Sequence, residues 1–285
     1  MFDGVHLGHR YIVETLKSLA KSSGQKTAIL TFWPHPRMVF ESASTLRLLS
    51  SLEEKEEILR LLGVEKFFIQ SFDESFRNLT GEEFVKKILV DRLKVRTLVV
   101  GYDHVFGKNK SGNFALLKKL SKLYDFALVQ TDPVSVGGRN VSSTEIRKIL
   151  QEGRIAEANA MLGYFYSITG EVVHGRKLGR TLGYPTANLK VDSHVLLPKN
   201  GAYIVEVEVE GHTYRGMMSI GVNPTFEDAE HSVEVYVLNF EKEIYGEKIK
   251  VRFREFLHEE IKFESAEKLK QKLDEDRKIT AEFGF

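Results

Sequence analysis

The sequence predicts an α/β domain with a parallel sheet, followed by a small antiparallel β-barrel with a terminal helix. Three observations lead to this fold class. Short apolar runs alternate with amphipathic helical segments in the first half, an order typical of a parallel sheet covered by helices on both faces. After about residue 163, apolar and polar residues alternate one by one, as in half-buried antiparallel strands. Glycine, asparagine and proline separate these later segments at short intervals.

The first half is predicted to contain four strands and the helices between them. The apolar runs that predict strands lie at 27–32, 67–69, 97–101 and 126–129. Residues at helical spacing predict helices over 9–22 and 113–123. Capping boxes, Ser51 with Glu54 and Thr80 with Glu83, mark the starts of two more helices.

The second half is predicted to be a barrel of short strands. Residues 203–209 and 233–237 alternate apolar and polar side chains, and turn residues bound them. A last helix is expected over about 265–281, with Leu269 and Leu273 one turn apart. We therefore place one domain at 1–158 and a second at 159–285.

Composition narrows the possible partners. The chain has 285 residues with 41 Lys+Arg against 40 Asp+Glu, so net charge gives no reason to expect nucleic acid or an anionic membrane as partner. It has no cysteine, which excludes disulfides and thiol nucleophiles. No apolar stretch suits a membrane span or a signal peptide. We expect a soluble cytoplasmic protein with no evident protein partner.

The opening loop is the first candidate site. His6 and His9 frame Gly8 just before the first predicted helix, and Gly4 lies two residues before His6. A helix N-terminus offers free N–H groups to phosphate, glycines allow close backbone approach, and imidazoles can donate to developing charge. The alternatives are a metal site or an ordinary helix start. Zinc is disfavoured because no third ligand is obvious.

A second phosphate-binding candidate opens the last helix of the first half. Ser142 and Glu145 fit a capping box, which is the structural alternative. The hydroxyls of Ser142, Ser143 and Thr144 can also bind phosphate, with Arg147 one turn further on. Arginine suits this role because its charge is permanent and its donors are forked.

The second half carries its own nucleotide candidate. Gly175, Arg176, Gly179 and Arg180 form a run in which backbone N–H groups and charge can wrap a triphosphate. Thr186 and Asn188 follow two residues apart, so both face the same side of an extended segment. Their neutral oxygens are suitable ligands for Mg²⁺, which takes most of its charged partners from substrate phosphates.

These motifs resemble those of the bacterial bifunctional riboflavin kinase/FMN adenylyltransferases. His6-Leu7-Gly8-His9 and Ser142-Ser143-Thr144-Glu145-Ile146-Arg147 resemble the two signatures of the nucleotidyltransferase superfamily. Thr31-Phe32-Trp33-Pro34-His35-Pro36 and the loop 101–112 are similar to further stretches of the family. Pro185-Thr186-Ala187-Asn188, the turn 221–226 and Glu234 resemble the riboflavin kinase motifs.

The resemblance implies a function for each half. A Rossmann-like nucleotidyltransferase domain would adenylylate FMN to FAD with ATP, and a riboflavin-kinase barrel would phosphorylate riboflavin to FMN. Glu234 would be the kinase base, although strand alternation alone favours a solvated glutamate. His6, His9 and Arg147 would act in adenylyl transfer. The implied flavin contacts are Asp103, Phe106, Asn223 and His258, and both steps would use Mg²⁺.

Several departures from the family leave alternatives open. His104 stands where the family often has Phe, Lys110 where it often has Arg, and His258 where it commonly has Arg. The family has a strand before the opening motif, whereas this sequence starts on it, so we expect the first sheet to lack that strand. A kinase with an inactive first half and a non-catalytic flavin- or nucleotide-binding module remain rivals. An adenylyltransferase for another phosphate ester is disfavoured by the barrel motifs.

Overall fold

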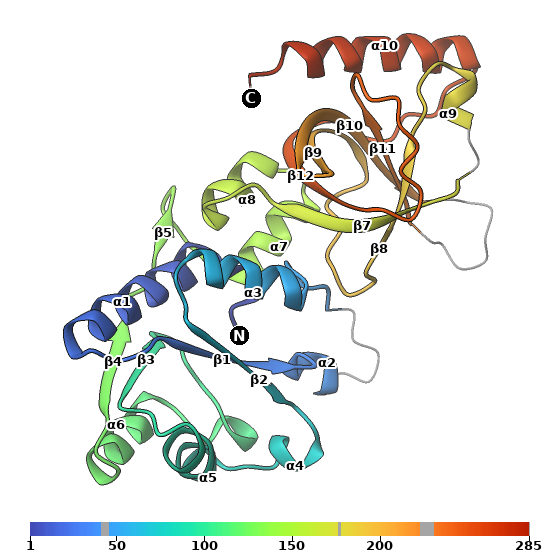
Figure 1. Ribbon diagram of the computed structural model, residues 1–285. Helices are drawn as coiled ribbons and strands as arrows, with labels where there is room; N and C mark the ends of the chain where they lie inside the picture. The colour runs from blue at the N-terminus through green and yellow to red at the C-terminus, as the bar shows by residue number, and fades with distance from the viewer. Residues whose placement is uncertain (41–45, 176–177, 223–230, 285) are drawn as a thin grey trace. The chain divides into compact units, whose positions relative to one another are not determined.

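The computed structural model describes residues 1–40, 46–175, 178–222 and 231–284 (Figure 1). It divides into two compact units, one of residues 1–46 and 52–142 and the other of residues 47–51 and 143–285. The units divide at residue 142, whereas the sequence suggested a domain boundary at 158. That boundary and the missing first strand stay predictions.

The first unit alternates helices and parallel strands, as the sequence predicted. Strand β1 pairs in parallel with β2, and β3 pairs in parallel with β4. Among the described residues no ladder joins these two pairs. The elements are η1 Asp3–Val5, α1 Leu7–Ser23, β1 Ala28–Trp33, α2 Pro36–Phe40, α3 Leu52–Leu61, β2 Lys66–Ser71, α4 Glu74–Arg77, α5 Gly81–Phe84, the π-helix η2 Val85–Arg92, β3 Thr97–Gly101, η3 Lys108–Lys110, α6 Phe114–Leu123, β4 Ala127–Thr131, β5 Ser135–Val136 and β6 Arg139–Asn140.

Among the described residues of this unit, one apolar cluster lies on each side of the strands. Figure 1 shows α1 and α3 on one side of β1–β4 and α5 and α6 on the other. The α1 and α3 side buries Val5, Val13, Ile29, Leu59 and Val64. The other side buries Phe84, Val85, Leu89, Val100, Leu117, Leu120 and Phe126. Apolar surface removed from water on both faces is what orders the helices against the strands.

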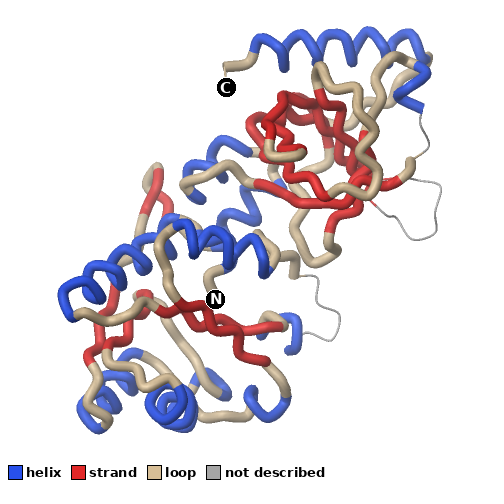
Figure 2. Tube along the Cα trace, viewed as in Figure 1, coloured by secondary structure: helices blue, strands red, loops and turns tan. Residues whose placement is uncertain are grey.

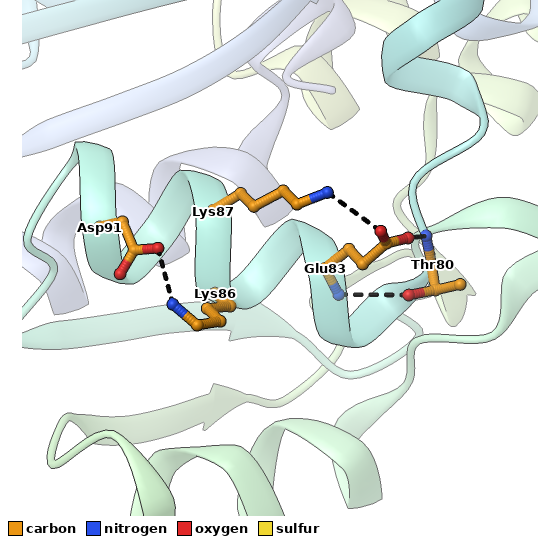
Figure 3. Close-up of polar contacts among 5 residues, drawn as sticks. All are labelled: Thr80, Glu83, Lys86, Lys87 and Asp91. Atoms are coloured by element: carbon orange, nitrogen blue, oxygen red, sulfur yellow. Dashed lines mark hydrogen bonds and ion pairs between the residues drawn. The ribbon is translucent and has the colours of Figure 1, made fainter.

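The predicted capping box at Thr80 is confirmed (Figure 3). The Thr80 hydroxyl accepts from the Glu83 N–H at 3.2 Å, and the Glu83 carboxylate accepts from the Thr80 N–H at 2.9 Å. The second bond is the main reason that the pKa of Glu83 falls to about 2. Lys87 pairs with Glu83 one turn later, and η2 continues the helix.

The second unit contains the predicted barrel, and Figure 2 shows its strands wound into a ring. The six strands close in the order β10-β11-β8-β7-β12-β9, and all their pairings are antiparallel. The elements are α7 Ser143–Gln151, α8 Ile155–Leu162, β7 Ser167–Val173, α9 Leu178–Thr181, β8 Ala187–Val191, β9 Gly201–Val209, β10 His212–Val222, β11 His231–Val237, β12 Lys248–His258 and α10 Ala266–Glu282.

Strand β9 shows why the alternating sequence forms a barrel wall. Tyr203, Val205 and Val207 are fully buried inside. The intervening Glu206 and Glu208 face outward and form ion pairs with arginines of the neighbouring strand β12. A one-residue slip would exchange these two faces, so the pattern fixes the strand register.

A buried asparagine fastens helix α8 to the barrel. The Asn159 amide Nδ2 donates to the carbonyl oxygen of Phe253 at 3.0 Å. Its Oδ1 accepts from the N–H of Tyr166 at 2.7 Å. Asn159 is only 9% exposed, so water is a poor substitute for either bond.

We expect Asn159→Ala to lower the free energy of unfolding by about 2–4 kcal/mol, because two buried backbone groups lose their partners. Urea denaturation followed by circular dichroism measures the change. Gln151→Ala, at an exposed amide on α7, is the matched control and should stay within about 0.5 kcal/mol of the wild type. Equal effects of the two substitutions would contradict this role of Asn159.

Candidate active sites

The opening loop forms a tight turn into helix α1. Gly4 has φ 74°, a left-handed conformation that favours glycine. His6 is the N-cap of α1, and its Nδ1 accepts from the N–H of His9 at 3.4 Å. A Cβ on Gly8 would lie 3.2 Å from the His6 ring, tighter than most contacts of its kind. Both glycines therefore suit the turn that places the histidines.

The two histidine rings of this loop stack on each other. Their centroids are 3.7 Å apart with an angle of 17° between the planes. Burial, followed by the neighbouring His6, holds the pKa of His9 well below its usual range, which favours a neutral ring. The Nδ1 of His9 is buried and has no hydrogen-bond partner among the described residues. Of the polar ring atoms of this pair, His9 Nδ1 is thus the one that a ligand could satisfy.

The residue that precedes the second phosphate motif lies close to this loop. A Cβ on Gly8 would lie 3.8 Å from the carbonyl oxygen of Val141, the residue before Ser142. Ser143 and Thr144 then form the first turn of α7. The Nε of Arg147 donates to the carbonyl oxygen of Arg47 at 2.8 Å. Phosphate binding by Arg147 stays a prediction.

The predicted flavin contacts of the first half differ in their surroundings. Asp103 is exposed. The Phe106 ring packs on Phe84 at 5.4 Å, and a Cβ on Gly112 would overlap it at 2.5 Å. Phe106 therefore belongs to the packing around the core, and its contact with flavin stays a prediction.

In the barrel, the structure brings Glu234 together with both predicted metal ligands. Glu234 on β11 is the register partner of Asn188 on β8. The Thr186 hydroxyl donates to Glu234 Oε2 at 2.8 Å, and the Ser232 hydroxyl donates to Oε1 at 3.0 Å. Each carboxylate oxygen is held by its own donor, so the group has a fixed direction. The carboxylate is half-buried rather than a freely solvated surface group.

The predicted glycines pass directly over this cluster. A Cβ on Gly175 would lie 2.1 Å from Asn188 Nδ2, and one on Gly179 would lie 2.3 Å from the Tyr184 carbonyl oxygen. Only glycine allows the backbone to come so close. Arg180 is exposed and pairs with Glu243 at 3.3 Å. Arg176 and Asn223 lie outside the described residues.

His258 ties the end of β12 to helix α10. Its Nδ1 lies 2.7 Å from the Glu259 carbonyl oxygen, and its Nε2 lies 2.8 Å from Asp276 Oδ2. Asp276 is 4% exposed and also pairs with Lys272 at 3.1 Å. The structure therefore gives His258 a link between two elements, and its contact with flavin stays a prediction.

Two residues in or near these candidate sites were missed by reasoning from the sequence. Ser232 precedes Glu234 by two residues, so strand alternation already placed both on one face. Lys55 is 2% exposed and precedes the buried Leu59 by one helical turn. A lysine on the apolar face of a predicted helix was the available signal.

The oxygen groups around Glu234 suit Mg²⁺ better than a soft metal. No group of three or more histidine, cysteine, aspartate or glutamate side chains within the described part of the chain is placed to hold a metal ion. Thr186, Asn188 and Glu234 instead offer neutral and carboxylate oxygens in one place. Mg²⁺ takes oxygen ligands and completes its shell with water and substrate phosphates, so this donor set fits it.

Comparisons with known proteins identify a family for each half of the chain. Residues 1–145 match the FAD synthetase family and residues 162–283 the riboflavin kinase family. The bifunctional riboflavin kinase/FMN adenylyltransferase of Listeria monocytogenes is 40% identical over 99% of this chain and 90% of its own. This chain belongs to that bifunctional family. The Escherichia coli K12 member is 35% identical over 99% of this chain and 90% of its own.

A solved crystal structure shares the fold of this chain. That protein, from Streptococcus pneumoniae, is named a macrolide-efflux protein, and it matches with a TM-score of 0.91 and 31% identity. The match covers 100% of this chain and 92% of that one. No helix among the described residues has the length and apolar character to cross a membrane.

Gly175→Ala tests the close approach over Asn188. The added methyl would displace the Asn188 amide, and a misplacement of this kind is expected to lower riboflavin phosphorylation by about 10- to 100-fold. Initial rates of FMN formation measure the effect. The matched control is Gly284→Ala, where a methyl meets no neighbour. Unchanged rates in Gly175→Ala would show that Asn188 does not need its observed position.

Proposed function

We propose that this chain makes FAD in two steps, phosphorylating riboflavin to FMN and then transferring AMP from a second ATP to FMN. Membership of the bifunctional family, with matches to both family models, supports the two activities. One observation carries the kinase assignment most strongly. The Glu234 carboxylate is aligned by Thr186 and Ser232 beside Asn188, as a positioned base requires.

In the kinase step, Glu234 accepts the proton of the ribityl 5′-hydroxyl. The hydroxyl oxygen then attacks the γ-phosphorus of ATP, and ADP leaves with the electron pair of the broken bond. Gly175, Arg176, Gly179 and Arg180 would wrap the triphosphate. Thr186 and Asn188 would hold Mg²⁺, which would neutralise phosphate charge.

In the adenylyl step, a phosphate oxygen of FMN attacks the α-phosphorus of ATP, and pyrophosphate leaves. His6 and His9 would donate hydrogen bonds to the charge that develops on the α-phosphate. Gly4, Gly8, Ser142, Ser143 and Thr144 would supply close backbone and hydroxyl contacts, and Arg147 permanent charge. Positioning and electrostatics suffice, without a covalent intermediate.

We also propose which residues contact flavin, which substrates bind and where the enzyme is located. Asp103, Phe106, Asn223 and His258 would contact flavin in the two halves. The substrates are riboflavin, FMN and ATP, and the reactions need neither nucleic acid nor a protein partner. We also propose that the enzyme is cytoplasmic.

Two variants assign the reactions to their sites. Glu234→Gln should lower FMN formation about 10²- to 10⁴-fold, because the base is lost, while supplied FMN is still converted to FAD. Replacing His6 and His9 together by alanine should lower FAD formation at least about 10²-fold and leave FMN formation intact. Chromatography of the products from riboflavin or FMN with ATP and Mg²⁺ measures both.

Glu171→Gln, an exposed carboxylate of the same barrel, is the control for Glu234 and should keep both activities. The reverse pattern in the two variants would refute the assignment of reactions to halves. FMN as the sole product of the wild type would favour the kinase-only alternative. Neither product would favour a binding module.

A further inference from the structure

Lys55 is an unusual residue in the first unit. It lies on helix α3 and is 2% exposed. Lysine is almost never fully buried unless an acidic partner offsets its charge. Its ammonium makes no hydrogen bond and no ion pair with any residue that the structure describes. A direct ion pair, the usual explanation for a buried lysine, therefore does not account for Lys55.

The helix that carries Lys55 packs on the opening loop. Leu59 of α3 is fully buried in the same apolar cluster as Val5, between Gly4 and His6. Helix α3 contacts η1, and Figure 1 shows it beside the start of the chain. Lys55 precedes Leu59 by four residues and so lies on the same face of the helix, one turn away. This places Lys55 at the opening loop.

The charges around Lys55 agree with this position. Asp3 of η1 is 2% exposed and within electrostatic reach of Lys55, which raises the lysine pKa. Burial is the larger influence and lowers the pKa of Lys55 below its ordinary value. The charge of Lys55 also contributes to the low pKa of His9. Lys55, Asp3 and His9 thus share one buried environment.

Burying a cation without a direct partner is unfavourable, and a bound anion would reverse that cost. The geometry points to Lys55 as a further ligand of the ATP phosphate chain, acting beside His6 and His9 in the adenylyl site. This inference rests on the proposed adenylyl transfer in the first half. The anion we assign to it is the polyphosphate of ATP, which carries more negative charge than the single phosphate of FMN.

The role of Lys55 in the reaction follows from the charges. When the FMN oxygen bonds to the α-phosphorus, the bond from that phosphorus to the bridging oxygen of the β-phosphate breaks. The electron pair stays on the leaving pyrophosphate, whose negative charge grows. A protonated Lys55 donates to a phosphate oxygen and offsets that charge in a site where water screens it little.

The competing explanation is that Lys55 only balances the charge of buried Asp3. The two explanations predict different stabilities for Lys55→Met, in which the new side chain has a similar length and no charge. If Lys55 is only a structural cation, Lys55→Met should be less stable than the wild type, because the charge of Lys55 would no longer offset that of Asp3. If Lys55 binds phosphate, Lys55→Met in the absence of ATP should be at least as stable as the wild type, because an unpaired buried amine has been removed.

The experiment compares wild type, Lys55→Met, Lys55→Arg and the control Lys21→Met, an exposed lysine of α1. FMN and MgATP are supplied, and kcat/KM for ATP in FAD formation is measured. Lys55→Met should lower it about 10- to 100-fold, the loss expected when a hydrogen bond to a charged group is removed. Lys55→Arg should recover part of the loss, and FMN formation from riboflavin should stay within about twofold.

A binding measurement without turnover tests phosphate binding by Lys55 independently of FAD formation. Inorganic triphosphate should raise the melting temperature of wild type and Lys21→Met more than that of Lys55→Met. If the wild type makes no FAD, the proposed function is wrong. The difference in triphosphate-induced melting temperature between wild type and Lys55→Met then decides alone whether Lys55 binds phosphate. If the wild type makes FAD and Lys55→Met keeps its kcat/KM within about twofold, Lys55 is not a phosphate ligand. A lower melting temperature of Lys55→Met without ligand also overturns it.

Discussion

The pairing of β8 with β11 is the constraint on which the barrel site depends. It sets Asn188 opposite Glu234 and brings the Thr186 hydroxyl within 2.8 Å of the carboxylate. The ladder has two register pairs among the described residues, and both strands also pair with other strands of the closed barrel. Closure removes the free edges along which strands slip, so a short pairing can position chemical groups accurately. The close approach of Gly175 to Asn188 then determines where the overlying backbone lies.

Local pattern predicted much of this arrangement, because strand alternation and helix starts are properties of neighbouring residues. The barrel strands, the alternation along β9 and the capping box of Thr80 follow from spacing alone. Thr186 and Asn188 were placed on one side by the same rule. Their meeting with Glu234 was not predictable from spacing, because it depends on a register between strands far apart in the sequence.

Motif reasoning did not reveal the packing partners of residues that depend on tertiary neighbours. Phe106 sits in a motif loop, but its ring packs beside Phe84, and Gly112 leaves the space for it. His258 was considered as a flavin contact, whereas its ring nitrogens face the Glu259 carbonyl oxygen and Asp276. In both cases the chain packing supplies partners that no short motif reveals. Contact of either side chain with flavin stays a prediction.

Lys55 extends this reasoning to the balance between stability and function. A side chain selected for stability alone would not be a lysine at a position where an apolar residue packs without penalty. Keeping a buried amine near Asp3 and His9 makes the free protein less stable than it needs to be. The same unfavourable environment strengthens any interaction between that amine and an incoming phosphate, because few waters compete for it. Part of the energy gained when the polyphosphate binds is then the relief of a strain that the folded chain carries in its absence.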